Sequence, residues 1–466
     1  MEPNPAPGAP AATPADQLPA GRPVHVAVVD LDGVPRGKRL GREKVLAALA
    51  GAPLGWCNVV FGWDLADAPY DNTALSGWHT GYPDAPVRLD AATLRHAPWH
   101  EGEAFMLGDF DGGGPLGDIC PRTALRRVLA KAAGMGYRVD AAVEYEWFVF
   151  DAEASRLALK RGTPPRPATI GMHGYSLLRP DQNAAFVRAL WTGLEAFGVP
   201  LEGLHTETGP GAFEAAPRYA DALAAADRAV CFKLAVKQMA RRHGLVASFM
   251  AKWRDDLPGC GGHVHQSLVE LATGRNVFAA RDGGGASGEA DPAARAYLAG
   301  QLAWLPHVLP LYAPTVNSYK RLVPGSWAAT TATWGRDNRT TALRLLGNRL
   351  ETRVPGADAN PYLALAAAVA SGLDGIERGR TPPPPVAGDA YAAPVAGAHP
   401  PLPRTLAEAT AALRARAAEV AALLGADAAR PAGALVDHFV RTREWECARH
   451  RAAVTDWERR RYLEAV

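Results

Sequence analysis

Cysteine is scarce in this sequence, and neither sign of charge is in excess. The five cysteines are scattered and odd in number, and no two are spaced as CxxC. This usage argues against a disulfide framework and is typical of a reducing compartment such as the cytoplasm. The formal net charge is only +2. The composition therefore gives no indication of a nucleic acid or an acidic membrane surface as partner.

Long apolar runs and the common phosphate-cradling glycine patterns are also missing. No run approaches the length of a membrane span, so we expect a soluble, cytoplasmic protein. The chain contains no GxxxxGKS/T, and no GxGxxG follows a predicted strand, so a nucleotide would need a different kind of site. Residues 1–23 are rich in Pro and Ala and lack the basic start and apolar core of a signal peptide. They predict a disordered tail.

The rest of the chain predicts two domains of the α+β class. A length of 466 residues is enough for two or three domains with sizeable cores. Residues 24–118 alternate short strands with turns rich in Gly and Pro, and they predict a small first domain. Residues 119–466 predict a second domain, in which helices back strands that carry inward-facing acids.

Three pairs of polar residues alternate along predicted strands of the second domain. The pairs are Glu144 with Glu146, His263 with His265, and Glu351 with Arg353. On a strand, side chains two positions apart lie on one face. A buried carboxylate without a partner is very costly, so polar pairs among apolar residues need a strong partner. A divalent metal ion is the obvious candidate.

Two further acids, Glu207 and Glu214, flank a Gly-Pro-Gly turn. The full candidate set is Glu144, Glu146, Glu207, Glu214, Glu351 and His263. Five carboxylates and one imidazole suit Mg²⁺ or Mn²⁺ better than structural zinc. Six ligands can also hold two ions, as is common in phosphoryl transfer. Any one of these glutamates alone is better explained by a salt bridge; the combined pattern favours metal.

Arginines form a second cluster within one 33-residue span: Arg321, Arg339, Arg344, Arg349 and Arg353. A lone arginine usually indicates a solvated face or a surface ion pair. Here Arg344, Arg349 and Arg353 interleave with apolar residues and with the proposed ligand Glu351. Such a cluster fits bidentate recognition of phosphate and carboxylate groups.

Several ordered motifs appear in the chain: VEYEWF, HTETGPGAFE, FMAKW followed by GCGGHVHQS, NSYKRLVPG, NRTTALRL, and RLETRV followed by NPYLALAA. Through them the sequence resembles the glutamine synthetase family over nearly its whole length beyond the tail. The resemblance implies a glutamine synthetase fold, with an N-terminal β-grasp domain and a catalytic domain whose curved antiparallel sheet forms a funnel backed by helices. It also implies a homo-oligomer, a dodecamer of two hexameric rings whose active sites lie between subunits.

The same resemblance implies a reaction. ATP, with Mg²⁺ or Mn²⁺, would phosphorylate the γ-carboxylate of glutamate, and an amine would attack the resulting acyl phosphate. Metals and arginines would neutralise the charge that moves between the phosphates.

Roles carry over position by position. Glu146, Glu207 and Glu214 match the first metal site, and Glu144, His263 and Glu351 match the second. His265, Ser267, Arg344 and Arg349 match nucleotide contacts, and Arg339 matches the residue that steadies the phosphoryl group. Arg321 and Arg353 match the clamp on glutamate, with Gly259 in the adjoining loop. Asp64 lies about where the family places an aspartate that reaches a neighbouring subunit's site, and we interpret it as the candidate base.

Departures from the family pattern concern the acceptor. Ammonia-using members carry a glutamate two residues after the Pro-Gly of NSYKRLVPG, where this chain has Trp327. Ala212 replaces a frequent glutamine, and Pro258 replaces a frequent asparagine. The pattern resembles the branch that makes γ-glutamyl amides, and it favours ethanolamine as the amine. The alternatives are a polyamine such as putrescine or spermidine, ammonia itself, and a catalytically silent relative. Trp327 would offer an apolar wall and a cation–π face, or it would only pack the flap.

Overall fold

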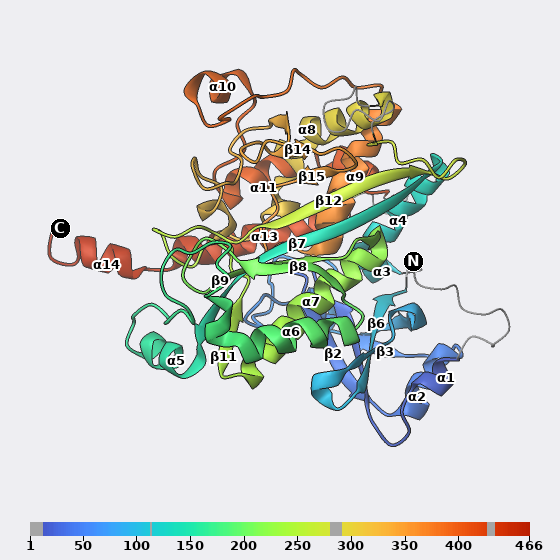
Figure 1. The fold of residues 1–466 in the computed structure, drawn as a ribbon. Coiled ribbons are helices and arrows are strands. Elements are labelled where there is room, and N and C mark those ends of the chain that lie inside the picture. Colours follow the sequence, from blue (N-terminus) through green and yellow to red (C-terminus); the bar gives the residue numbers. More distant parts are fainter. Residues whose placement is uncertain (1–12, 112–113, 280–290, 426–433) are drawn as a thin grey trace.

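The computed structural model describes residues 13–111, 114–279, 291–425 and 434–466, and within them two β-sheets are surrounded by helices (Figure 1). The disordered tail predicted for residues 1–23 falls partly outside these ranges. Its described part contains a short helix, α1 (Pro14–Gln17), followed by the buried Leu18.

The first sheet has six strands: β1 (Val24–Val29), β2 (Pro35–Leu40), β3 (Gly55–Cys57), β4 (Asp84–Leu89), β5 (Arg95–Ala97) and β6 (Glu103–Phe110). Their order is β2-β1-β6-β4-β3, with β5 also paired to β6. Strands β1 and β6 are parallel, and the other pairs are antiparallel. The turn between β1 and β2 is closed by Asp30, whose Oδ1 accepts hydrogen bonds from the backbone N–H groups of Asp32 and Val34.

The second sheet has nine strands: β7 (Tyr137–Asp151), β8 (Leu201–Thr206), β9 (Ala212–Pro217), β10 (Ala220–Asp221), β11 (Leu245–Ser248), β12 (Gly262–Glu270), β13 (Trp334–Arg336), β14 (Leu343–Leu345) and β15 (Leu350–Thr352). Its order is β13-β14-β15-β12-β7-β9-β8, and β10 and β11 also pair with β7. All pairs are antiparallel except β13 with β14. The long strands β7 and β12 run side by side through the middle of the molecule (Figure 1).

Helices cover this sheet, and two of them pack unusually closely. Within α8 (Pro292–Tyr312) and α9 (Pro361–Glu377), a Cβ added at Gly300 would lie 2.2 Å from the carbonyl oxygen of Ser371, and one added at Gly375 would lie 2.0 Å from that of Ala296. Only glycine allows this approach. The other helices are α2 (Arg42–Leu49), α3 (Pro115–Ile119), α4 (Pro121–Gly134), α5 (Ala152–Lys160), α6 (Ala184–Ala196), α7 (Ala222–Arg242), α10 (Ala393–Ala398), α11 (Leu406–Ala415), α12 (Ala417–Leu423), α13 (Ala434–Ala452) and α14 (Asp456–Tyr462).

The architecture is α+β, as predicted, with a smaller N-terminal sheet and a larger sheet backed by helices. The domain boundary predicted at residue 118 falls inside α3 and stays a prediction. Across the described ranges, no helix is both long and apolar enough to span a bilayer.

Candidate active site

Strand register brings the predicted acids and imidazoles together. Strand β12 lies between β7 and β15, so its side chains meet those of both neighbours. His263 pairs with Glu144 of β7, and His265 pairs with Glu351 of β15. On the far side, Glu351 pairs with Arg344 of β14. Directly opposed residues in an antiparallel pair share one face of the sheet. The polar residues that alternate along β7, β12 and β15 therefore form one continuous polar surface on that face.

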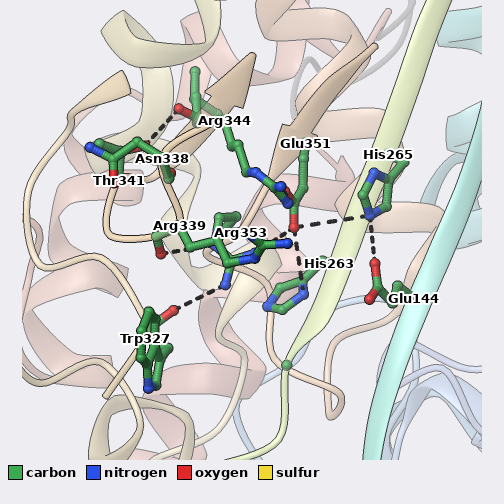
Figure 2. A network of polar contacts seen from close by, with 12 residues as sticks. Glu144, His263, His265, Trp327, Asn338, Arg339, Thr341, Arg344, Glu351 and Arg353 are labelled. Atoms are coloured by element: carbon green, nitrogen blue, oxygen red, sulfur yellow. Dashed lines mark hydrogen bonds and ion pairs between the residues drawn. The ribbon is translucent and has the colours of Figure 1, made fainter. Parts of the chain in front are cut away.

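Glu351 lies at the centre of this surface (Figure 2). Its carboxylate accepts hydrogen bonds from Arg353 Nη1 at 2.6 Å and from Arg344 Nη1 at 3.0 Å. His263 Nδ1 lies 3.7 Å from Glu351 Oε1. Burial alone would raise the pKa of this carboxyl, but Arg353 and then the two histidines outweigh it and lower the pKa to about 2. Glu351 is therefore a fixed negative charge inside the protein.

Three side chains are close enough to share one metal ion. Glu144, His265 and Glu351 each offer a ligand atom, and these atoms lie within 4.8 Å of one another. His265 Nε2 is 2.8 Å from Glu144 Oε2. The sequence analysis assigned His263 to this site and His265 to the nucleotide. Here His265 lies closest to Glu144, whereas His263 lies between Glu351 and Glu146, at 3.7 and 3.9 Å, so the division of roles between the two histidines stays a prediction.

The other three predicted ligands line the same cavity beside this group. Glu146 of β7 pairs with Glu214 of β9, and Glu207 lies in the turn between β8 and β9. Burial raises the pKa of Glu146. Burial, a hydrogen bond with Glu144 and repulsion from the neighbouring carboxylates raise the pKa of Glu214 well above its usual range. Without a cation, the raised pKa values of Glu146 and Glu214 favour their protonated forms.

The donor set fits divalent cations. Hard carboxylate oxygens with a few imidazoles are the ligands that Mg²⁺ and Mn²⁺ accept. Burial lowers the pKa of His263 to about 3, so its ring is neutral, which is the form that coordinates a metal. A bound cation would replace the protons of the acids and remove their mutual repulsion.

A cavity of about 370 Å³ contains these groups together with the predicted glutamate site. Its walls include all six predicted metal ligands. They also include Arg321, Arg353, Gly259, Arg339, Arg344 and Trp327. The structure thus gathers residues predicted for metal, glutamate, phosphoryl group and acceptor around one space.

A second cavity, of about 440 Å³, is lined by the predicted nucleotide contacts His265, Ser267 and Arg349. Glu144 lines both cavities. Arg344, which was also predicted to contact the nucleotide, lines the first cavity instead and bonds to Glu351 and Asp337. A phosphoryl donor bound in the second cavity and a carboxylate bound in the first would therefore lie next to each other at Glu144.

Two buried arginines form the floor of the first cavity. Arg321 donates to the carbonyl oxygens of Val354 at 3.0 Å and Arg353 at 3.2 Å. Arg353 in turn donates from Nε to the carbonyl oxygen of Arg339 at 3.1 Å. Burial lowers the pKa of Arg321, yet a guanidinium keeps its charge in proteins. The pair presents fixed positive charge to any carboxylate that enters.

The structure places Trp327 and Asp64 at two different cavities. Trp327 lines the first cavity, is 60% exposed and has a left-handed backbone, with φ of 59°. Asp64 lines a separate cavity of about 950 Å³, where its Oδ1 accepts hydrogen bonds from the N–H groups of Ala66 and Ala68. Asp64 is therefore not brought to the active site of its own subunit.

Three residues in or beside the cavity were not predicted from the sequence. Tyr175 and Thr208 line it, and Tyr175 stacks on His205 with ring centroids 4.5 Å apart. His205 Nε2 lies 3.5 Å from Glu214 Oε1. His205 precedes Glu207 by two positions, so the same alternation rule could have found it. Tyr175 lies in an irregular segment that has no period to reveal it.

A mixed α+β fold with clustered carboxylates, imidazoles and arginines between two adjoining cavities defines a metal-dependent enzyme of the phosphoryl-transfer type. The family model described as glutamine synthetase, catalytic domain, matches residues 118–462. The chain belongs to the glutamine synthetase family.

Relatives match nearly the whole chain but differ in the amine that they are named for. A type-1 glutamine synthetase 2 of Dictyostelium discoideum is 44% identical over 95% of this chain and 84% of its own length. A glutamate–isopropylamine ligase of a Pseudomonas species is 36% identical over 95% of each chain. A gamma-glutamylethanolamide synthetase of Streptomyces coelicolor is 38% identical over 95% of this chain and 93% of its own.

A solved structure agrees with this assignment. The ADP complex of GmaS superposes with a TM-score of 0.81 at 30% identity, covering 95% of this chain and 96% of the other. The protein is thus an ATP-dependent glutamate–amine ligase of the glutamine synthetase family, and this family implies ATP and a divalent metal as partners of the site.

Proposed function

We propose that the chain joins the γ-carboxylate of glutamate to a small primary amine, with ethanolamine as the best match, through a γ-glutamyl phosphate. The observation that carries the proposal is Trp327, which lines the cavity at the position where ammonia-using members have a glutamate. A carboxylate there would attract ammonium. An indole instead offers an apolar wall and a cation–π face.

The energetics favour an organic amine. A cation over an indole face gains roughly 0.5–2 kcal/mol, depending on how far it is desolvated. Ammonium is hydrated more strongly than an alkylammonium ion, so it loses more on leaving water. The hydrocarbon part of ethanolamine would also cover the exposed ring of Trp327.

The remaining residues have roles in binding and charge compensation. The second cavity would take ATP beside His265, Ser267 and Arg349. Arg321 and Arg353 would hold the glutamate carboxylates, with Gly259 in the adjoining wall. Arg339 would neutralise charge on the phosphoryl group as it leaves one cavity for the other. Mg²⁺ or Mn²⁺ held by the six acids and imidazoles would supply further charge compensation between the phosphates.

The cavity argues against a polyamine. The second ammonium group of putrescine or spermidine needs a carboxylate partner. The acids that line the first cavity within the described residues are Glu144, Glu146, Glu207, Glu214 and Glu351. All five belong to the proposed metal sites, so among the described residues of one subunit this cavity has no further acid for a second ammonium group.

Ammonia is the second candidate acceptor. The Dictyostelium relative at 44% identity is named a glutamine synthetase, which favours this alternative. A catalytically silent relative has little support, because each of the six predicted metal positions carries a ligand and lines the cavity.

We also propose a dodecamer of two hexameric rings in the cytoplasm. Asp64 points to shared sites, since it lies outside its own subunit's active-site cavity and would serve as the base only in a neighbour's. All five cysteines are free, which suits a reducing compartment.

The test is ATP-dependent phosphate release with glutamate and a panel of acceptors: ethanolamine, isopropylamine, putrescine, spermidine and ammonium. We expect kcat/KM to be highest for ethanolamine and lower for ammonium. Glu351→Gln serves as the inactive control. Should ammonium equal the organic amines, the protein is an ordinary glutamine synthetase and the proposed acceptor is wrong.

A further inference from the structure

A proline-rich segment, residues 383–391, is bonded to the loop that carries Trp327 and Arg339; we name it the strap. Residues 382–385 are consecutive prolines, which fix an extended backbone. Behind them Val386 and Ala390 are buried. The strap is therefore a stiff segment that is anchored in the core at two points.

Residues 386–390 of the strap hold the backbone around Arg339. Asn338 Nδ2 donates to the carbonyl oxygens of Val386 at 3.1 Å and Gly388 at 2.8 Å. The N–H group of Ala390 donates to Thr340 Oγ1 at 3.0 Å. Because Asn338 and Thr340 flank Arg339, these bonds hold the backbone on both sides of Arg339, the residue proposed to face the phosphoryl group.

The last residue of the strap, Tyr391, also holds the backbone beside Trp327. The half-buried Tyr391 donates its hydroxyl to the carbonyl oxygen of Ala328 at 3.1 Å. The chain then forms α10 at the edge of the molecule (Figure 1) and returns to the same loop, where Leu402 N donates to Thr330 O and Ala332 N donates to Pro400 O, each at 2.9 Å. The loop that begins at Trp327 is therefore bonded both to the residue before α10, Tyr391, and to residues after it, Pro400 and Leu402.

The indole of Trp327 depends on this backbone for its position. It is 60% exposed, and in the described part of the chain no aromatic ring stacks on it. The Trp327 carbonyl oxygen accepts from Arg353 Nη2, but at 3.5 Å that bond is long. Arg353 is also the proposed clamp for glutamate. The bond from the Tyr391 hydroxyl to the next carbonyl, that of Ala328, is thus a side-chain anchor beside Trp327 that does not involve a substrate-binding group.

We propose that the strap positions the acceptor site and that Tyr391 is the residue that sets the place of Trp327. This inference rests on the proposed function, because it takes Trp327 as the acceptor wall. It adds that amine selectivity is controlled from a residue that touches neither substrate nor metal.

The test is a double-mutant cycle of Tyr391→Phe and Trp327→Ala in the full-length protein. Removing one hydroxyl leaves the ring in place, and we expect KM for the acceptor to rise roughly fivefold, the factor that one ordinary hydrogen bond represents. KM for glutamate and ATP should stay within about twofold. In the Trp327→Ala background, Tyr391→Phe should cause no further change. Tyr137→Phe, at the far end of β7, is the matched control.

Two results would overturn the inference: an unchanged acceptor KM in Tyr391→Phe, or an equal rise with and without Trp327. Either result would show that Tyr391 does not affect acceptor binding by positioning Trp327. KM in this cycle is measured with the acceptor that the wild type prefers. A wild type that prefers ammonium would therefore refute the proposed acceptor while leaving the strap testable on its own. Thermal unfolding of each variant shows whether a change in KM comes from lost structure.

Discussion

Arg353 directly follows the strand that carries Glu351, and its Nη1 lies 2.6 Å from Glu351 Oε1, with both side chains almost fully buried. The proposed clamp for glutamate and a proposed metal ligand are thus the two halves of one ion pair. Breaking such a pair by removing one partner typically costs about 3–5 kcal/mol, because the other charge stays buried. Substitutions at either position must therefore keep shape and polarity to be informative.

Replacing Glu351 by Gln should abolish ATP turnover and keep the fold. Glutamine retains hydrogen bonding to Arg344 but removes the charge that a cation would bind, so we expect a loss of at least about 100-fold in kcat. Phosphate release and the unfolding temperature measure the two effects. Glu214→Gln should behave alike, and Glu270→Gln, a glutamate at the end of β12 that lines neither cavity, is the control. Full activity of chelator-treated protein without added Mg²⁺ or Mn²⁺ would refute the metal assignment.

Replacing Arg353 by Lys should raise KM for glutamate by roughly tenfold. An ammonium group cannot make the planar two-point contact of a guanidinium, and it also loses the bond to the Arg339 carbonyl oxygen. Initial rates at varied glutamate concentration give the value. Arg349→Lys provides the comparison, since it should raise KM for ATP instead. An unchanged KM for glutamate in Arg353→Lys counts against the clamp.

Replacing Trp327 by Glu should move the preference towards ammonium. The new carboxylate would attract the small cation and remove the apolar wall, so the ratio of kcat/KM for ethanolamine to that for ammonium should fall by about tenfold. Trp327→Gln separates the loss of the wall from the gain of charge. If both variants keep the wild-type ratio, Trp327 only packs the flap.

Metal binding should release protons, and the release should depend on Glu214. Its pKa is raised by burial, by the hydrogen bond with Glu144 and by repulsion. Above the usual carboxyl pKa of 4.5, the folded metal-free protein therefore holds a proton that the unfolded chain has lost, and stability falls as pH rises. The pKa of Glu144 is lowered instead, so its contribution to folding stability is fully present above pH 4.5 and does not change with pH there. The gain in unfolding temperature with Mn²⁺ should grow from about pH 6 to 8.5.

Calorimetry in buffers of different ionisation enthalpy counts the protons released on Mn²⁺ binding. The Glu214→Gln variant should release fewer protons and show a flatter pH dependence. If the variant and the wild type release equal numbers of protons, the group that loses a proton on Mn²⁺ binding is not Glu214.

Mixing two inactive variants should restore activity if the sites are shared. Asp64→Asn would remove the candidate base, and Glu351→Gln would remove a metal ligand of the other half-site. After dissociation and reassembly, some sites combine two intact halves, and about a quarter of the wild-type rate is expected for random mixing of equal amounts. Mass measurement in solution gives the number of subunits. No recovery in a reassembled oligomer argues that Asp64 does not act across subunits.

The sequence predicted the strands of the site better than the loops around it. Glu144 with Glu146 and His263 with His265 lie on strands as expected, and Glu351 lies on a strand that Arg353 directly follows, because the alternation of side chains along a buried strand is visible in the sequence. Tyr175 and the strap could not be predicted, since irregular segments have no period and their contacts depend on residues far away in the chain. In the structure Arg344 donates to Glu351, and the nucleotide contact that the resemblance implies for it stays a prediction.

The left-handed backbone at Trp327 lies outside the sheet that bears the acids. Under the proposed function, most of the metal-binding acids and the acceptor wall therefore belong to different parts of the chain: strands carry the acids, and a loop carries Trp327. An engineer could alter residues 326–328 and the strap to admit bulkier amines without disturbing the strands. The same scaffold could then be diversified into a set of ligases that share one activation step.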